Sequence, residues 1–422
     1  MFNFSIRNGT LFSALPSPQV QRGDLVVEKG QIVAVGPGVA TADAIDAKGA
    51  LVLPGLVNAH THLYSALACG MPGPASPPQN FVEILERIWW RLDRALNRES
   101  LICSALIGGL EAARSGVTVV FDHHASPKHI EGSLDLIAEG LAAVGIQGLL
   151  CYEVTDRNGA VGTQAGLDEN ARYIREEQRP SRGLIGGHAS FTLSQETIQA
   201  LGSLSRKLRR GFHIHVAEDG ADLTPGDPIQ RYDEATLLGP DTILAHGVHL
   251  NPESLKKAAD RGCTLVHNPR SNMNNAVGYA RGVADYPRVA VGTDGIGSDI
   301  LTELRTAFLQ AREAKLPDAW GLTDRLFRGG FELAQHHLGG ERGRLSVGAV
   351  GDVILTDYIP PTPLRADNYL GHLLFGFDRS HIRQVWCRGR QVWPTSLDMV
   401  EITERSRNAA ETLWKHMGDL DG

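Results

Sequence analysis

Cysteine is scarce in this 422-residue chain, and its five cysteines are scattered and odd in number. None stands in a C-x-x-C spacing, so the sequence indicates neither a disulfide scaffold nor a thiolate metal site. No run approaches the roughly 18 apolar residues that a membrane helix needs. The first seven residues lack the charged and then apolar build of a secretory signal. We therefore expect a cytoplasmic protein with no membrane span.

An excess of positive charge is also missing, because the formal net charge is −7 at pH 7. This acidic balance argues against a general surface for nucleic acid or for an anionic membrane. The phosphate-binding loops G-x-G-x-x-G and G-x-x-x-x-G-K-[ST] do not follow any strand-like run. With 42% hydrophobic residues, the chain has enough apolar material for one large core and a smaller one. The expected partner is a small molecule.

The chain does contain eight short apolar runs, and each of them ends in polar residues able to bind a metal or a substrate. These ends are residues 58–62, 122–124, Glu153, His188, 213–218, His246, 267–269 and 293–295. A parallel barrel brings the carboxyl ends of its strands to one mouth, so residues far apart in sequence meet there. The arrangement therefore predicts one shared site.

Strand-like and helix-like segments alternate through the middle of the chain. The near-continuous apolar run 116–121 is typical of a buried parallel strand. Helices are expected at 131–144, 195–208 and 252–261. Such alternation over roughly 290 residues predicts a (β/α)8 TIM barrel. A doubly wound open sheet is the alternative, and the missing phosphate loop weakens it.

Both terminal regions are β-rich, and residues 25–35 have the pattern of a hairpin. The economical interpretation is a small β-sandwich built from both termini, flanking a barrel inserted between them. The predicted division is a sandwich of 1–53 with 346–395, a barrel of 54–345 and a C-terminal helix within 396–422. The Pro/Gly-rich insertions 71–79 and 221–228 are expected to be loops over the barrel mouth.

Four of the strand ends fit one metal site. His60 and His62 stand two residues apart at the end of the first strand, so both side chains point the same way. His215 adds a third nitrogen and Asp294 adds a carboxylate, at the ends of the fifth and eighth strands. Three histidines and an aspartate with room for water are typical of a catalytic metal. We expect one divalent ion per chain, with Zn2+ the default and Fe2+ or Mn2+ also suited.

Further polar residues at the mouth are candidates for catalysis or substrate binding. Glu218 lies close enough to reach a water on the metal, and His246 is placed to contact that water or the group it attacks. Trp89 and Trp90 fit either a helix core or a cap on a flat ring. Arg270 and the asparagines after it fit either a self-bonded turn or donors to ring heteroatoms. The substrate-binding candidates are His188, Trp90, Arg270, Asn272 and Glu153.

These motifs resemble the amidohydrolase superfamily, in its cytosine-deaminase-like branch with one metal, and most of all the SsnA-type aminohydrolases. The segments that carry the resemblance are 55–68, 89–94, 122–127, 187–194, 215–219, 245–250, 267–278, 292–295 and 357–364. The resemblance implies metal binding by His60, His62, His215 and Asp294. It also implies Glu218 as proton shuttle, His246 as a polarising residue and His188 as a substrate contact. No lysine stands near His188 to bridge a second metal, and a homodimer is expected from the family.

The leading hypothesis is a metal-dependent aminohydrolase that releases ammonia from a nitrogen heterocycle such as a purine or pterin. A second hypothesis is a metal-dependent hydrolase that expels another group, such as halide from a triazine or an imino group from a guanidine-like compound. Retention of Glu218 favours a leaving group that needs a proton. A third is a non-catalytic barrel, which the complete ligand set disfavours.

Overall fold

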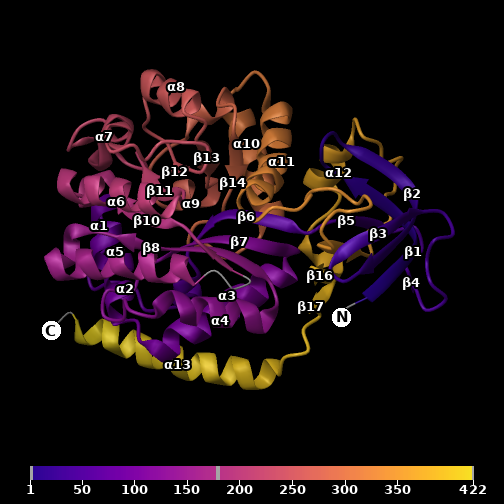
Figure 1. Ribbon diagram of the computed structural model, residues 1–422, viewed down its shortest axis with the longest axis horizontal. Coiled ribbons are helices and arrows are strands. Elements are labelled where there is room, and N and C mark those ends of the chain that lie inside the picture. The colour runs from indigo at the N-terminus through magenta and orange to yellow at the C-terminus, as the bar shows by residue number, and fades with distance from the viewer. Residues whose placement is uncertain (1–2, 177–180, 421–422) are drawn as a thin grey trace.

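The computed structural model of the protein describes residues 3–176 and 181–420. The first two residues of the predicted sandwich and the last two of the predicted C-terminal segment lie outside this description. A barrel surrounded by helices lies beside a mainly antiparallel sheet in Figure 1. No helix in the described residues is long and apolar enough to cross a membrane.

Eight parallel strands form the barrel, in the order in which they follow one another along the chain. They are β6 (Leu56–Thr61), β7 (Val117–His124), β8 (Gln147–Val154), β10 (Ile185–Ala189), β11 (Phe212–Val216), β12 (Ile243–His246), β13 (Thr264–His267) and β14 (Val289–Val291). A parallel bridge between Thr61 and Asp294 joins the first strand to the end of the last. The ring is thereby closed, and the doubly wound alternative is wrong. The short β9 (Arg182–Gly183) pairs with β8 beside the ring.

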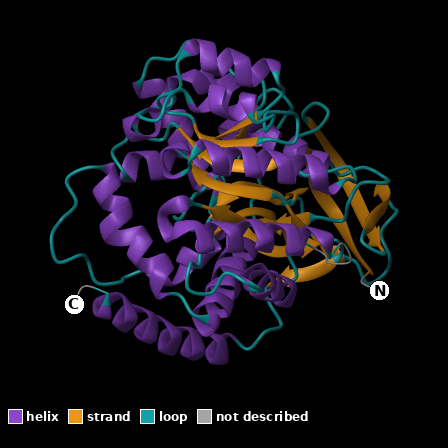
Figure 2. Ribbon diagram, turned by 60° about the vertical axis from the view of Figure 1, so that its left-hand side comes forward, coloured by secondary structure: helices purple, strands orange, loops and turns teal. Residues whose placement is uncertain are grey.

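The barrel strands are apolar along their whole length because helices cover them outside and side chains fill the inside. All eight residues of β7 and of β8 are buried. Figure 2 shows the helices wrapped around the strands. The helices are α1 (Phe81–Ile84), α2 (Trp90–Ala95), α3 (Arg98–Arg114), α4 (Ser133–Val144), α5 (Gly159–Arg175), α6 (Gln195–Leu208), α7 (Pro228–Glu234), α8 (Pro252–Asp260), α9 (Pro269–Asn274), α10 (Ile300–Glu313), α11 (Ala319–Leu338), α12 (Tyr369–Phe375) and α13 (Met399–Asp419).

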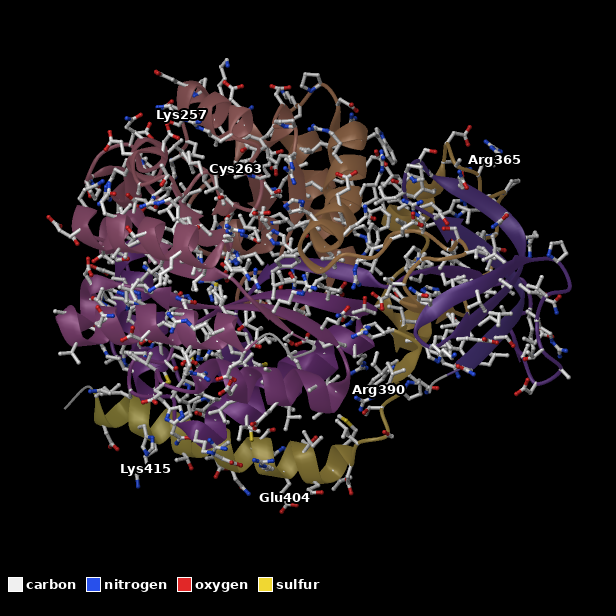
Figure 3. The ribbon with its side chains drawn as sticks, in the orientation of Figure 1. Lys257, Cys263, Arg365, Arg390, Glu404 and Lys415 are labelled. Atoms are coloured by element: carbon white, nitrogen blue, oxygen red, sulfur yellow. The ribbon has the colours of Figure 1, made fainter. Side chains whose placement is uncertain are left out.

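The second sheet draws its strands from both ends of the chain, in the order β17-β16-β15-β5-β1-β2-β3, with β4 paired to β1. They are β1 (Asn3–Ser13), β2 (Gln19–Glu28), β3 (Gln31–Gly36), β4 (Ile45–Asp46), β5 (Leu51–Pro54), β15 (Val353–Thr356), β16 (Ile382–Cys387) and β17 (Arg390–Trp393). It encloses its own apolar core, which includes Ile6, Leu25 and Trp386. Arg390 anchors β17 to the barrel by donating to the carbonyl oxygens of Ala142 and Ala143, each at 3.0 Å (Figure 3).

The predicted fold class, a TIM barrel with a small sandwich from both termini, is confirmed. The division of the chain into 1–53 with 346–395, 54–345 and 396–422 stays a prediction. The hairpin and the predicted helices are present, whereas the second predicted loop contains a 3₁₀ turn at Gly220–Leu223. The last helix, α13, runs beneath α3 and α4 in Figure 1. Leu413 on this helix is buried, whereas Val400 near its start is exposed.

Gly329 allows α11 to pack closely on β14. A Cβ at this position would lie 1.7 Å from the carbonyl oxygen of Val289. We expect Gly329→Ala to lower the free energy of unfolding by about 3 kcal/mol, because backbone atoms must move apart. Gly371→Ala is the matched control on α12, since a Cβ there meets nothing within 4 Å. Thermal denaturation of both variants tests this, and equal stability of the two would contradict it.

Candidate active site

Four side chains able to bind a metal meet at the carboxyl end of the barrel. They are His60 and His62 of β6, His215 of β11, and Asp294 after β14. His62 Nε2 lies 3.0 Å from His215 Nε2 and 2.9 Å from Asp294 Oδ1. His60 Nε2 lies 3.5 Å from the same carboxylate oxygen. One ligand atom from each residue can be chosen so that all lie within 4.8 Å of one another. The four residues can therefore surround a single ion.

The second ring nitrogen of each histidine is held by a partner further from the centre. Nδ1 of His62 bonds to the backbone oxygen of His123 at 2.6 Å, and Nδ1 of His215 bonds to that of His188 at 2.8 Å. Nδ1 of His60 pairs with Nε2 of His213 at 2.9 Å. A carbonyl partner makes Nδ1 the donor and leaves Nε2 with a free lone pair. The Nε2 atoms are thus oriented as metal ligands.

The electrostatics of this cluster also suit a cation. Nε2 of His60 is buried and has no hydrogen-bond partner. Burial lowers the pKa of His60 to about 3, so its ring is the neutral form that binds metals. Burial opposes a proton on His62 too, but the Asp294 carboxylate outweighs it and raises the pKa of His62 to about 9. The cluster attracts one positive charge in this way, and a divalent ion fits its donor set of three imidazoles and a carboxylate.

Glu218 and His246 lie beside the four candidate ligands. Nε2 of His246 lies 3.6 Å from Glu218 Oε2 and 3.9 Å from Asp294 Oδ2, and it has no hydrogen-bond partner. Asn272 accepts from Nδ1 of His246 at 2.8 Å, while Asn275 donates to Glu218 Oε1 at 3.1 Å. Burial raises the pKa of Glu218 to about 7, so this carboxyl can hold a proton near neutral pH. The group combines a proton donor with a positioned imidazole.

Three residues around this centre have a left-handed backbone. The φ angles are 45° for Ala217, 74° for His246 and 54° for Asp294. Non-glycine residues rarely adopt positive φ, which costs about 1–3 kcal/mol each and tends to cluster at active sites. Asp294 is held in this conformation by bonds from the amides of Thr293 and Asp294 to the oxygen of His60, at 2.9 and 3.0 Å. The strained residues lie at or just after strand ends, where the backbone turns and directs side chains into the site.

A cavity opens above the histidines. Aromatic side chains form much of its wall, together with carboxylates and small polar groups. The lining residues are His62, Tyr64, Ser65, Phe81, Leu85, Trp89, Trp90, Glu153, His188, Ala189, Phe191, His215, Glu218, Asp219, Asp222, Ser271, Asn274, Asn275, Asp294, Gly295 and Ile296. Trp89 ends a π-helical turn, Leu85–Trp89, and such turns are frequent at functional sites.

The structure brings some of the predicted substrate-binding residues into this cavity and leaves others out. Trp90, Glu153 and His188 line it, so the two tryptophans are not simply helix core. Arg270 does not line it, because its Nε bonds to the buried carboxylate of Glu303 at 2.6 Å. Asn272 is buried behind the wall, where it contacts His246. The buried carboxylate of Glu303 requires a positive partner, and its ion pair with Arg270 directs that side chain away from the cavity.

The last two residues of β7, His123 and His124, do not line the cavity. His123 and His124 are fully buried. His123 instead lies beneath the site, where its Nδ1 is 3.1 Å from Glu153 Oε2. The burial of β7 continues through its polar last residues, so these rings are enclosed by the protein.

Three contributors to the site were not singled out from the sequence. His213 supports His60, and its H-x-H spacing with His215 was the available signal. The hydroxyl of Ser271 donates to Asp294 Oδ2. Asp222 accepts from the amides of Ala217 and Phe191, at 2.6 and 2.9 Å, and so ties two walls of the cavity together. No local pattern marks the last two residues.

A closed parallel barrel with this donor set at its mouth defines a barrel hydrolase. A family model described as the amidohydrolase family matches residues 51–392, and the chain belongs to that family. It is thus an enzyme that hydrolyses carbon–nitrogen bonds other than peptide bonds.

Known proteins of similar sequence match this chain over most of its length. A 5-methylthioadenosine/S-adenosylhomocysteine deaminase of Desulforudis audaxviator is 30% identical, over 88% of this chain and 89% of the relative. A 5'-deoxyadenosine deaminase of Methanosarcina mazei is 28% identical, over 98% and 99%. Among solved structures, an adenosine deaminase from Xanthomonas campestris with bound zinc has a TM-score of 0.83 at 22% identity, over 98% of both chains. At this identity the last likeness supports the fold alone.

Proposed function

We propose that the enzyme is a metal-dependent deaminase that replaces a ring amino group of a purine base or nucleoside by oxygen and releases ammonia. The observation that carries this proposal is the placement of Glu218 and His246 against the cluster of His60, His62, His215 and Asp294. The names of the similar proteins, which are deaminases of adenosine-type compounds, support the substrate class.

The proposed ligands are the three histidines and Asp294. A divalent metal held there, with zinc the first choice, supplies Lewis acidity that lowers the pKa of a coordinated water from about 15.7 to about 7. Asp294 would accept a proton from the attacking water, since its carboxylate lies among the ligands. His246, fixed by Asn272, would hold the attacking oxygen in line through its free Nε2.

Glu218 would deliver the proton that the ring needs. Attack on the carbon that bears the amino group places electrons on the neighbouring ring nitrogen, and protonation there lowers the barrier. The carboxyl of Glu218 is suited to this step, because burial keeps it protonated to about pH 7. Asp294 would then pass the proton taken from the water to the amino group, which leaves as ammonia, while Glu218 would take up the hydroxyl proton as the C=O bond forms. Trp90 and His188 are the proposed contacts to the flat ring, with Glu153 beside them.

The first test is to purify the protein with its metal, quantify the metal, and measure ammonia release from purines, purine nucleosides, pterins, pyrimidines and triazines. One metal per chain and ammonia from an aminopurine are expected. Full metal occupancy without ammonia from any ring amine would favour another leaving group. A chain that binds no metal would overturn the proposed metal-dependent mechanism. A homodimer and a cytoplasmic location belong to the same proposal and are tested by light scattering and cell fractionation.

A further inference from the structure

The cavity described above has an unusual balance of charge. Among its described lining residues there is no lysine or arginine, whereas five are acidic. Two of these, Glu218 and Asp294, belong to the proposed chemistry. The other three are Glu153, Asp219 and Asp222. Lys257, Arg365 and Lys415, which are labelled in Figure 3, lie on the periphery of the molecule.

Arg157 and Arg270 come near the cavity, but both are committed elsewhere. Arg270 is paired with Glu303. The guanidinium of Arg157 lies 4.2 Å from the ring centre of Trp90, and it contacts Glu153 and Asp93 at 3.4 and 3.5 Å. Neither arginine lines the cavity. Away from the proposed metal, an anionic group on a substrate would therefore lose its water without gaining a basic side chain as counter-ion.

The acidic wall is compensated unevenly. Glu153 shares the charge of Arg157, and both oxygens of Asp222 accept from backbone amides. Asp219 is half-buried and accepts from the amide of Ala221 at 2.9 Å. Within residues 3–176 and 181–420, Asp219 makes no ion pair. Its charge is consequently the least neutralised of the three.

We propose that this cavity admits neutral or cationic heterocycles and rejects those with an anionic substituent, and that Asp219 is a specificity-determining residue. The substrates are then bases or nucleosides in preference to nucleotides. This inference rests on the proposed function for its substrate class, and it adds a rule of charge selection that the deaminase chemistry itself does not require.

The test compares matched pairs, adenosine with its 5'-monophosphate and guanosine with its 5'-monophosphate, on the metal-loaded enzyme. Binding is measured by quenching of tryptophan fluorescence, because Trp89 and Trp90 line the cavity, and turnover by ammonia release. We expect the dissociation constant of the nucleotide to exceed that of its nucleoside by at least about tenfold, and the gap to shrink as salt is added.

The variant Asp219→Asn removes the charge and keeps the oxygen that accepts from Ala221. This variant should reduce the ratio of the nucleotide's dissociation constant to that of the nucleoside by about three- to tenfold, as expected for one charge several ångströms away in a partly buried site. Asn274→Arg, which adds a cation at the exposed part of the wall, should narrow it as well. Glu253→Gln removes an equal charge from the surface of α8 and should leave the ratio unchanged.

The outcomes separate the two proposals. Ammonia from nucleoside and nucleotide at equal efficiency would uphold the deaminase and overturn the charge rule. A nucleoside preference in binding that Asp219→Asn narrows, without ammonia from any compound, would uphold the charge rule and overturn the deaminase. Absence of binding by all four compounds, or a ratio that Asp219→Asn leaves unchanged, would overturn the role given to Asp219.

Discussion

Replacing Glu218 by glutamine is expected to lower kcat by about a thousandfold, in the middle of the range of general acid–base catalysis. The amide keeps the size of the side chain and still meets Asn275, but it cannot carry the proton that the ring nitrogen needs. Metal content and melting temperature should stay near those of the parent enzyme, because Glu218 is not a proposed ligand. Steady-state ammonia release and elemental analysis measure the two effects.

The matched control for this variant is Glu253→Gln, which makes the same chemical change at an exposed position. It should retain the parent kcat. A Glu218→Gln enzyme with near-normal kcat would remove Glu218 from the mechanism. Loss of metal in that variant would instead make Glu218 a ligand.

Replacing Asp294 by asparagine is expected to lower metal affinity by at least a hundredfold and to reduce turnover below about one thousandth. The change removes the only carboxylate of the proposed ligand set and the proposed acceptor of the water's proton. Asparagine is chosen over alanine because it tolerates the left-handed backbone, with φ of 54°, at this position. The fold should therefore survive, as circular dichroism can check.

Ser271→Ala provides the graded comparison for Asp294. It removes the hydroxyl that contacts Asp294 Oδ2 and keeps the carboxylate. A loss of about tenfold in turnover, with metal retained, is expected from such an outer contact. Full metal occupancy together with full rate in Asp294→Asn would contradict its assignment as ligand and proton acceptor.

The sequence predicts the fold and the position of the site well because both depend on local patterns. Apolar runs of strand length identify the buried strands, and residues such as Glu153 and His188 mark their ends. In a parallel barrel, position along a strand determines which end of the barrel a residue occupies. The prediction that these ends share one mouth follows from that rule, and Glu153 and His188 do line the same cavity.

Side-chain direction beyond the strand ends could not be predicted in the same way. Arg270 and Glu303 are 33 positions apart, and nothing local in either segment indicates their pairing. The burial of His123 depends on the packing of its neighbours on β8 and β11. Charge balance inside a cavity is a property of many segments together, so it becomes visible only when the chain is folded.

The bridge between Thr61 and Asp294 lies at the seam where the first barrel strand meets the end of the last. The backbone of His60 and Asp294 closes this seam, and the side chains of the same residues belong to the candidate ligand set. An ion held there would join the two ends of the ring, so metal binding would add to the stability of the barrel as well as supply the chemistry. Loss of the ion would then lower the free energy of unfolding, while the backbone hydrogen bonds of the seam keep the ring closed.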